Sequence, residues 1–460
     1  MKYKIISSLF VGLLAMNNAF PIAGAEIAEN MELSLPPEKS QWFREAKFGM
    51  FIHWGLYSLL EGSYNGHTLP DASFKYGRSW YAEWIWKRLE VPDEEYKALV
   101  RQFNPVNFDA DEWIREAKNA GMRYFAITSK HHDGFALWDT KFSDFNVMNT
   151  PYGKDILAQL VNACKKYGLK YGFYYSHWMD WEYPGGARED WQDVKQPSNE
   201  EFQVYWEKKS LPQVKELIEK FDPDFFWFDT WGSEGIHITP ARRDELIRLV
   251  RANSSKCLIN GRIAYSNPGN NVDFIEMLDN VYSKEILLKP WQTPATMNRS
   301  FGWHANDFNW KSSSTMLEHL FNCVSKSGNY LLNIGPKADG SFPVAAVRRL
   351  REMGAWISAN NEAIYETSPV PINVDPNQGV YLTQKSENEK NYLYVTIFKP
   401  VENLELPIGK NSLRVIDAKV VETNQPISFS QSDNELVLTI PQNIFSGCQI
   451  IVVKIEIHNS

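Results

Sequence analysis

Short apolar runs alternate with longer helical patterns between about residue 40 and residue 365 of this 460-residue chain. Eight of the runs have the length and the β-branched and aromatic content of strands. Such alternation is typical of parallel strands joined by helices, and it predicts an α/β fold with a (β/α)8-like barrel. The strands are expected at Phe48–His53, Tyr124–Ser129, Lys170–Ser176, Phe225–Asp229, Cys257–Arg262, Val272–Glu276, Thr293–Asn298 and Tyr330–Ile334.

Helical patterns fill the stretches between these runs, and Asp109 and Thr239 are suitable capping residues for two of them. The main helices are expected at 110–120, 155–167, 200–220, 240–252, 314–325 and 344–360. After Ser368, short alternating strands broken by Asn, Pro, Gly and Ser predict an antiparallel β-sandwich. We therefore expect a barrel domain over residues 26–366 and a C-terminal β-sandwich over residues 367–460, interpreted as a structural cap on the barrel rather than a separate carbohydrate-binding module.

Residues 1–25 have the pattern of a secretory signal peptide. Lys2 and Lys4 precede a short apolar stretch, and Ala23-Gly24-Ala25 provides a small-x-small cleavage site. A membrane anchor needs about 20 apolar residues, whereas polar residues interrupt this stretch. We expect a protein secreted across the inner membrane, to the periplasm.

The overall charge disfavours nucleic acid and membrane surfaces as partners. The chain carries 48 basic and 56 acidic residues, a net charge of −8, and no run rich in Lys or Arg. Its four cysteines, Cys164, Cys257, Cys323 and Cys448, have no C-x-x-C spacing and are interpreted as small buried hydrophobic residues.

Polar and aromatic side chains gather at the carboxyl ends of the predicted strands, where a parallel barrel carries its active site. They are His53, His131, His132, Tyr174, Asp229, Arg262 and Glu276. Rings can stack on the apolar faces of a sugar while fixed polar groups bind its hydroxyls. A pair of carboxylates among them suggests cleavage of a glycosidic bond.

A zinc site at His53, His131 and His132 is the alternative use of these histidines. Adjacent residues of a strand point to opposite sides, and no H-x-x-x-H or Cys partner accompanies the three. We therefore predict no metal and no cofactor.

The barrel region resembles the α-L-fucosidases of glycoside hydrolase family 29 over residues 40–365. The resemblance rests on several fragments together, namely Phe51–Gly55, Trp80–Trp84, Lys130–Phe135, Trp227–Asp229, Ser300–Trp303 and Asn329–Pro336. It implies an eight-stranded barrel with a C-terminal β-sandwich, retention of anomeric configuration through a covalent intermediate, and no metal.

The resemblance also implies roles for individual residues. Asp229 matches the nucleophile, and Glu83 with Trp84 matches a pair that lines the same site. Phe51 and Phe301 match the apolar contact to the methyl group on C5 of fucose. The residues matched to the fucose hydroxyls are His53, His131, His132, Tyr174 and Arg262.

The general acid/base is assigned to Glu276, which lies 47 residues after Asp229 in the sequence. Glu285 and Glu83 are the alternatives. Many relatives carry Trp-Glu where this chain has Trp291-Gln292, and a neutral amide cannot exchange a proton near neutral pH.

These observations predict an exo-acting, retaining α-L-fucosidase acting on a fucosylated oligosaccharide or glycoconjugate. Two alternatives stay open: an exo-glycosidase for α-galactoside-type sugars on the same barrel, and a catalytically weak glycan-binding relative.

Overall fold

The computed structural model describes residues 35–188, 195–230, 237–264, 272–372, 374, 376–408, 413–446 and 450–459. The expected signal peptide and Cys448 lie outside these residues.

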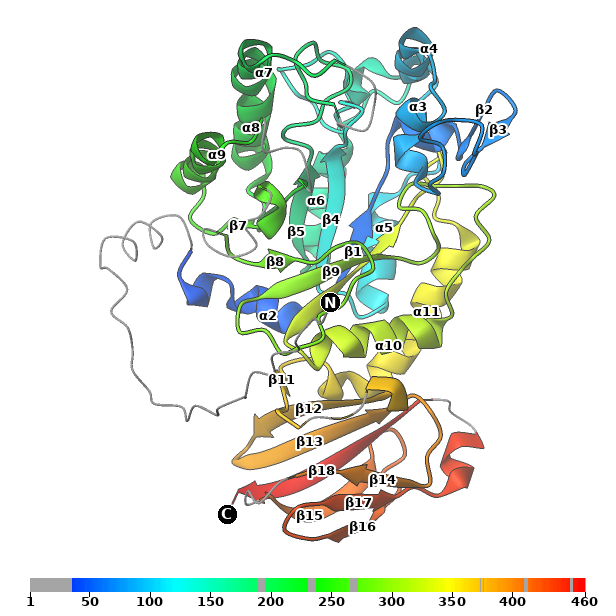
Figure 1. Ribbon diagram of the computed structural model, residues 1–460, viewed down its shortest axis with the longest axis vertical. Helices are drawn as coiled ribbons and strands as arrows, with labels where there is room; N and C mark the ends of the chain where they lie inside the picture. The colour runs from blue at the N-terminus through cyan, green and yellow to red at the C-terminus, as the bar shows by residue number, and fades with distance from the viewer. Residues whose placement is uncertain are drawn as a thin grey trace, which may run out of the picture.

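The eight predicted strands form one parallel sheet, in which strands that follow each other along the chain are also neighbours in space (Figure 1). A parallel bridge between Asn260 and Phe274 joins the two edges of this sheet, which confirms the (β/α)8-like barrel. The strands are β1 (Phe48–Ile52), β4 (Tyr124–Lys130), β5 (Lys170–Tyr175), β6 (Phe225–Phe228), β7 (Leu258–Ile259), β8 (Ile275–Glu276), β9 (Trp291–Thr296) and β10 (Gly328–Ile334).

The helices lie close to their predicted positions. Asp109 caps the helix that follows it by accepting the Asp111 and Glu112 N–H groups, and Thr239 accepts the N–H of Arg242. The helix predicted at 200–220 is two helices joined by a π-helical turn at Trp206–Ser210. The helices are α2 (Gln41–Ala46), α3 (Ile85–Arg88), α4 (Asp93–Ala98), α5 (Ala110–Asn119), α6 (Ile156–Tyr167), α7 (Asn199–Tyr205), α8 (Leu211–Phe221), α9 (Pro240–Asn253), α10 (Ser313–Val324) and α11 (Val344–Asn360).

Aromatic side chains fill the lower part of the barrel. Because side chains alternate along a strand, Phe225 and Trp227 face the interior while Phe226 and Phe228 pack against the surrounding helices. Helix α2 closes this end, where the Phe43 ring stacks on Phe274 with centroids 4.4 Å apart (Figure 1). Side chains therefore fill the barrel interior at this end. The loops at the opposite end carry a short hairpin of β2 (Ser63–Tyr64) and β3 (His67–Thr68).

Two antiparallel sheets form the C-terminal domain. They are ordered β11-β12-β13-β18-β15 and β14-β17-β16 and enclose an apolar core of their own. The strands are β11 (Ser368–Pro369), β12 (Val380–Glu387), β13 (Lys390–Ile397), β14 (Asn403–Leu406), β15 (Leu413–Val420), β16 (Ser428–Gln431), β17 (Leu436–Thr439) and β18 (Ile451–Asn459). All four residues of β16 are exposed.

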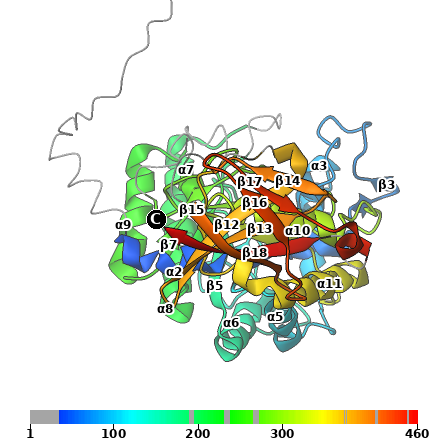
Figure 2. The same ribbon diagram turned by 90° about the horizontal axis from the view of Figure 1, so that it is seen from below.

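The C-terminal domain packs against α10 and α11, away from the hairpin end of the barrel (Figures 1 and 2). The Phe398 ring lies 5.8 Å from that of Phe321, and the Tyr394 hydroxyl donates to Glu362 at 2.9 Å. These contacts attach the C-terminal domain to the barrel, and its role as a structural cap stays a prediction.

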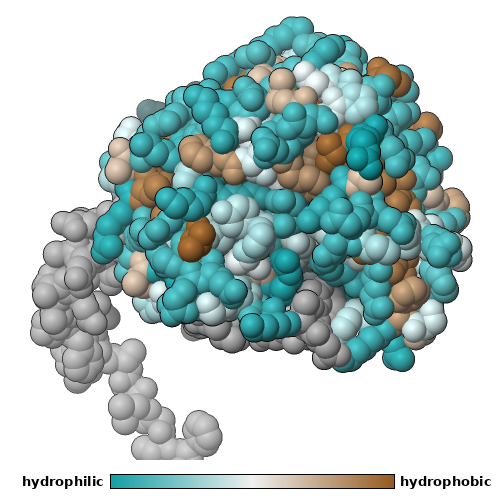
Figure 3. Space-filling model, turned by 90° about the horizontal axis from the view of Figure 1, so that it is seen from above, coloured by the Kyte–Doolittle hydropathy of each residue, from teal (hydrophilic) through white to brown (hydrophobic). Residues whose placement is uncertain are grey.

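The described cysteines are buried, and the visible surface is mostly polar. Cys164, Cys257 and Cys323 are buried free thiols. The face seen in Figure 3 is mostly hydrophilic, with small separate hydrophobic patches. None of the helices in the described part of the chain is long and apolar enough to cross a membrane.

Candidate active site

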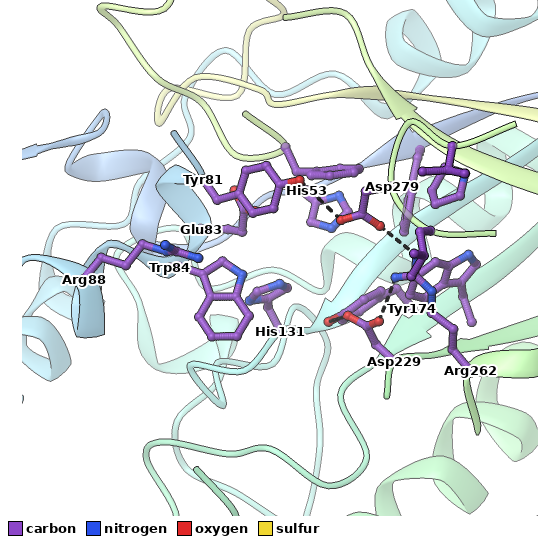
Figure 4. A pocket seen from close by; sticks show the side chains of 16 residues that line it. His53, Tyr81, Glu83, Trp84, Arg88, His131, Tyr174, Asp229, Arg262 and Asp279 are labelled. Carbon is purple, nitrogen blue, oxygen red and sulfur yellow. Dashed lines mark hydrogen bonds and ion pairs between the residues drawn. The ribbon is translucent and has the colours of Figure 1, made fainter. Parts of the chain in front are cut away.

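A pocket of about 480 Å³ opens above the aromatic floor (Figure 4), within the size range of small-molecule sites. Of the predicted site residues, only Glu276 and His132 are not part of its lining. The lining residues are Phe51, His53, Tyr81, Glu83, Trp84, Arg88, His131, Tyr174, Trp227, Asp229, Arg262, Leu278, Asp279, Val281, Pro294 and Phe301.

Asp229 follows β6 directly and points into the pocket, as the alternation from Phe225 and Trp227 requires. Its Oδ1 receives a hydrogen bond from Arg262 Nη1 at 3.1 Å, and its Oδ2 receives one from the Tyr174 hydroxyl at 2.8 Å. Burial raises the pKa of Asp229 to about 6, although Arg262 opposes the rise. The carboxylate is therefore ionised at neutral pH while keeping one charged and one neutral donor.

The histidines of the site are neutral. Burial lowers the pKa of His53 to about 4 and holds the pKa values of His131 and His132 well below their usual range. His132 Nε2 lies 3.7 Å from Asp229 Oδ2, and because the ring is neutral, the charge that stabilises this carboxylate comes from Arg262. As neutral rings, His53 and His131 offer the pocket hydrogen-bonding groups without charge.

Two of these histidines contact polar side chains that are not metal ligands. His53 Nδ1 lies 2.7 Å from Asn333 Oδ1, and His132 Nδ1 lies 2.7 Å from the Ser176 hydroxyl. Among the described residues, no three His, Cys, Asp or Glu side chains form a group that could hold a metal ion.

One side of the pocket is apolar. The rings of Phe51 and Phe301 both lie against His53, with centroid separations of 4.5 and 4.8 Å. Trp227 stacks on Tyr174 with centroids 5.2 Å apart. Such a surface suits the apolar edge and the C–H face of a sugar.

Glu83 lines the same pocket from a 3₁₀ turn at Ala82–Trp84. Its Oε2 accepts the N–H of Gly302 at 2.7 Å, and burial raises the pKa of Glu83 to about 7. A β-carbon at position 302 would lie 2.9 Å from the backbone nitrogen of Glu83, so this close approach requires glycine. Trp84 beside it lines the same wall.

Asp279 is a second acidic side chain close to Asp229, and the sequence analysis did not select it. It lies on the loop after β8, where its Oδ1 accepts from Arg262 Nη2 at 2.7 Å and its Oδ2 from the Tyr81 hydroxyl at 3.4 Å (Figure 4). Arg262 therefore contacts two carboxylates in one pocket.

Comparisons with known proteins identify the family of this chain. The family model described as "Alpha-L-fucosidase" matches residues 22–362. The chain belongs to the α-L-fucosidase family. It is therefore a glycoside hydrolase. Curated relatives of this family member include the α-L-fucosidase of Dictyostelium discoideum, 28% identical with coverage of 87% of this chain and 88% of that protein, and the plasma α-L-fucosidase of Homo sapiens, 26% identical with coverage of 87% and 85%.

Solved fucosidase structures share the fold. The α-L-fucosidase from Vibrio sp. strain EJY3 is 30% identical with a TM-score of 0.82, covering 93% of this chain and 74% of that one. A family 29 α-L-fucosidase from Bacteroides thetaiotaomicron is 26% identical with a TM-score of 0.80, covering 92% and 95%. Another structure of a fucosidase from that organism, at the same identity, is described as a trapped covalent intermediate in complex with 2-fluoro-fucosyl fluoride.

Glu276, the predicted acid/base of this family member, faces the barrel interior but is not part of the pocket lining. Its Oε2 accepts the side-chain amide of Gln292 at 2.9 Å, and Gln292 Oε1 accepts the Tyr124 hydroxyl at 2.8 Å. Burial raises the pKa of Glu276 to about 8. The amide at position 292 fits because it donates to one neighbour and accepts from the other.

Glu285 is exposed and lines a separate groove, together with Val380 and Leu382 of the C-terminal domain. The pocket therefore brings Asp229 together with Glu83 and Asp279, and with neither of the other two glutamates. The role assigned to Glu276 stays a prediction.

Residue spacing alone did not find Asp279 because β8 has only two residues. The strand ends at Glu276, so the pocket is reached by the loop that follows rather than by the strand. The sequence did offer one indication of Asp279, namely an acidic residue on the loop after a barrel strand, where the active sites of barrels lie.

Proposed function

We propose that this protein is an exo-acting, retaining α-L-fucosidase that removes terminal α-linked L-fucose from oligosaccharides or glycoconjugates. The observation that carries the proposal is Asp229, which is held by Arg262 and Tyr174 at the base of a pocket closed beneath by aromatic side chains. A pocket closed at one end admits a chain terminus rather than the middle of a glycan. The choice of fucose as the sugar rests on the α-L-fucosidase relatives.

Asp229 acts as the nucleophile. Its carboxylate attacks C1 of the fucosyl group, the bond from C1 to the glycosidic oxygen breaks, and the leaving oxygen takes a proton from a second carboxyl group. Water then attacks C1 and gives a proton to that second carboxyl group, and the ester bond to Asp229 breaks to regenerate the carboxylate. With a pKa raised to about 6, Asp229 is ionised at neutral pH and is more basic than an ordinary aspartate.

The walls of the pocket favour a deoxy sugar. Phe51 and Phe301 are 1% and 4% exposed and present only hydrocarbon, which suits the C5 methyl group of fucose. A sugar with a hydroxymethyl group there would bury its hydroxyl without a partner. This apolar contact argues against an α-galactoside substrate.

Gln292 does not argue for a weak glycan-binding relative. Its side chain lies outside the pocket lining, between Tyr124 and Glu276, so the amide removes no acid from the sugar site.

The test is hydrolysis of an aryl α-L-fucoside beside the matched aryl α-D-galactoside, with the first-formed anomer identified by NMR. We expect cleavage of the fucoside alone and α-L-fucose as the initial product. A 2-fluoro fucosyl donor should label a peptide containing Asp229. Initial release of the β-anomer, or a label on another residue, would contradict the mechanism.

We also propose export to the periplasm. The support is the basic, apolar and small-residue order of the first 25 residues. Fractionation of cells followed by sequencing of the mature N-terminus tests it, with Glu26 expected first and an uncleaved cytoplasmic chain as the contrary result.

A further inference from the structure

We propose that Asp279, on the loop after β8, is the general acid/base of this enzyme. The inference rests on the proposed fucosidase activity and concerns the group that protonates the leaving oxygen and later activates water. It is argued from the position of Asp279 relative to Asp229, from its access to solvent, and from the partners of the other carboxyl groups.

Arg262 sets the position of Asp279 relative to the nucleophile. Its Nη1 donates to Asp229 at 3.1 Å and its Nη2 donates to Asp279 at 2.7 Å. Figure 4 shows the two carboxylates on either side of the guanidinium. Because one guanidinium bonds both carboxyl groups, they lie close together, as the two carboxyl groups of a retaining glycosidase must.

Asp279 also lies where a leaving group and a water molecule can reach it. Its side chain is 30% exposed, against 10% for Asp229. Its loop neighbours Leu278 and Val281 line the same pocket and are 64% and 46% exposed. The loop therefore forms part of the pocket mouth, where the aglycone departs.

The competing carboxyl groups are placed for other tasks. Glu83 is only 2% exposed, and the Gly302 N–H fixes it against the wall beside Trp84, which suits a group that binds a sugar hydroxyl. Glu276 lies outside the pocket lining, with Gln292 hydrogen-bonded to its Oε2.

The shared guanidinium gives Asp279 both halves of its task. In the first step a proton moves from the Asp279 carboxyl group to the glycosidic oxygen as the C1–O bond breaks and the Asp229 carboxylate bonds to C1. Esterification then removes the charge of Asp229, which leaves Asp279 as the anion beside Arg262. It takes a proton from water while the water oxygen bonds to C1 and the ester is released.

The test compares Asp279→Ala with the control variants Glu276→Gln and Glu83→Gln. For the Asp279 variant, we expect kcat/KM to fall by about 10²–10⁴-fold on a fucosyl disaccharide, whose leaving oxygen needs a proton, and much less on 2,4-dinitrophenyl fucoside, whose leaving group does not. Added azide should accelerate turnover of the dinitrophenyl substrate and give α-fucosyl azide, because azide needs no general base. Neither control variant should respond to azide.

Azide rescue separates a catalytic from a positioning role, since a variant that merely displaced Arg262 would lose activity on both substrates and gain nothing from azide. If Asp279→Ala does not fold, Asp279→Asn is measured instead. Rescue of Glu276→Gln or Glu83→Gln, or an Asp279 variant with unchanged rates, overturns the inference. A wild-type protein that fails to hydrolyse aryl fucosides, or inverts configuration, overturns the proposed function itself.

Discussion

Asp229 and Glu276 are both acidic side chains that end inward-facing rows of barrel strands, yet the structure gives them different surroundings. Asp229 has a cationic donor in Arg262 and reaches the pocket, whereas the hydrogen-bond donor at Glu276 is the neutral amide of Gln292, outside the pocket lining. Burial raises both pKa values, to about 6 for Asp229 and about 8 for Glu276. The two carboxyl groups thus differ in whether a cation bonds them directly and in whether the pocket reaches them.

The largest effect is expected when the Asp229 carboxylate is removed. Asp229→Gly removes the nucleophile, and we expect kcat on an aryl fucoside to fall by about 10⁴-fold or more. Azide should restore turnover by attacking C1 directly, and the product should be β-fucosyl azide, the opposite anomer from that expected with the Asp279 variant. Unchanged turnover would remove Asp229 from the mechanism.

The second effect removes the charged partner. Arg262→Gln leaves Asp229 buried without its cation, and we expect a loss of about 10²–10³-fold in kcat/KM. Since Arg262 lowers the pKa of Asp229, its removal raises that pKa. Activity requires the ionised form, so the acidic limb of the pH profile, with its midpoint near 6 in the wild type, should move to higher pH.

Arg262→Lys sharpens the same test. It retains the charge but not the fork that reaches Asp229 and Asp279 together. The acidic limb should shift less than in Arg262→Gln while kcat still falls. An unmoved limb in both variants would show that another group controls the ionisation of Asp229.

The sequence could predict Asp229 because period-two alternation in a four-residue aromatic strand leaves only one orientation for the next side chain. It predicted all eight barrel strands because buried parallel strands are short apolar runs between helical patterns. It could not place Glu276 and Asp279 relative to the pocket, because β8 spans two residues and the loop conformation after it depends on Arg262, whose Nη2 bonds the Met277 carbonyl oxygen. Contacts between distant loops decide such positions, and no local pattern records them.

The third effect is smaller and removes the neutral donor. Tyr174→Phe deletes the hydroxyl that donates to Asp229 at 2.8 Å while keeping the ring against Trp227. A hydrogen bond to a charged group contributes about 1.5–3 kcal/mol, so we expect a loss of about 10–100-fold in kcat/KM. The acidic limb should again move upward, because the hydroxyl lowers the pKa of Asp229. A profile identical to that of the wild type would mean that Arg262 alone holds the carboxylate.

Substitution of Glu276 is expected to have the smallest effect on activity. The quantity to measure in this case is the free energy of unfolding. Burial raises the folded-state pKa of Glu276 to about 8, above the 4.5 of an unperturbed glutamate, so the folded state binds this proton more tightly than the unfolded chain. Its contribution to stability is therefore complete below pH 4.5 and is lost as the pH rises toward 8. Glu276→Gln mimics the protonated form and carries no such loss. Measured by urea unfolding, the free energy of unfolding of the variant should rise relative to that of the wild type as the pH rises from 5 to 8, by about 1–3 kcal/mol at pH 7.

Gln292→Glu is the matched control for the Glu276 variant. It places a second carboxyl group beside Glu276, so its loss of unfolding free energy relative to the wild type should grow with pH. If the difference in unfolding free energy between Glu276→Gln and the wild type were constant across this range, Glu276 would already be ionised in the folded protein. Asp229 and Glu276 would then differ only in whether they line the pocket.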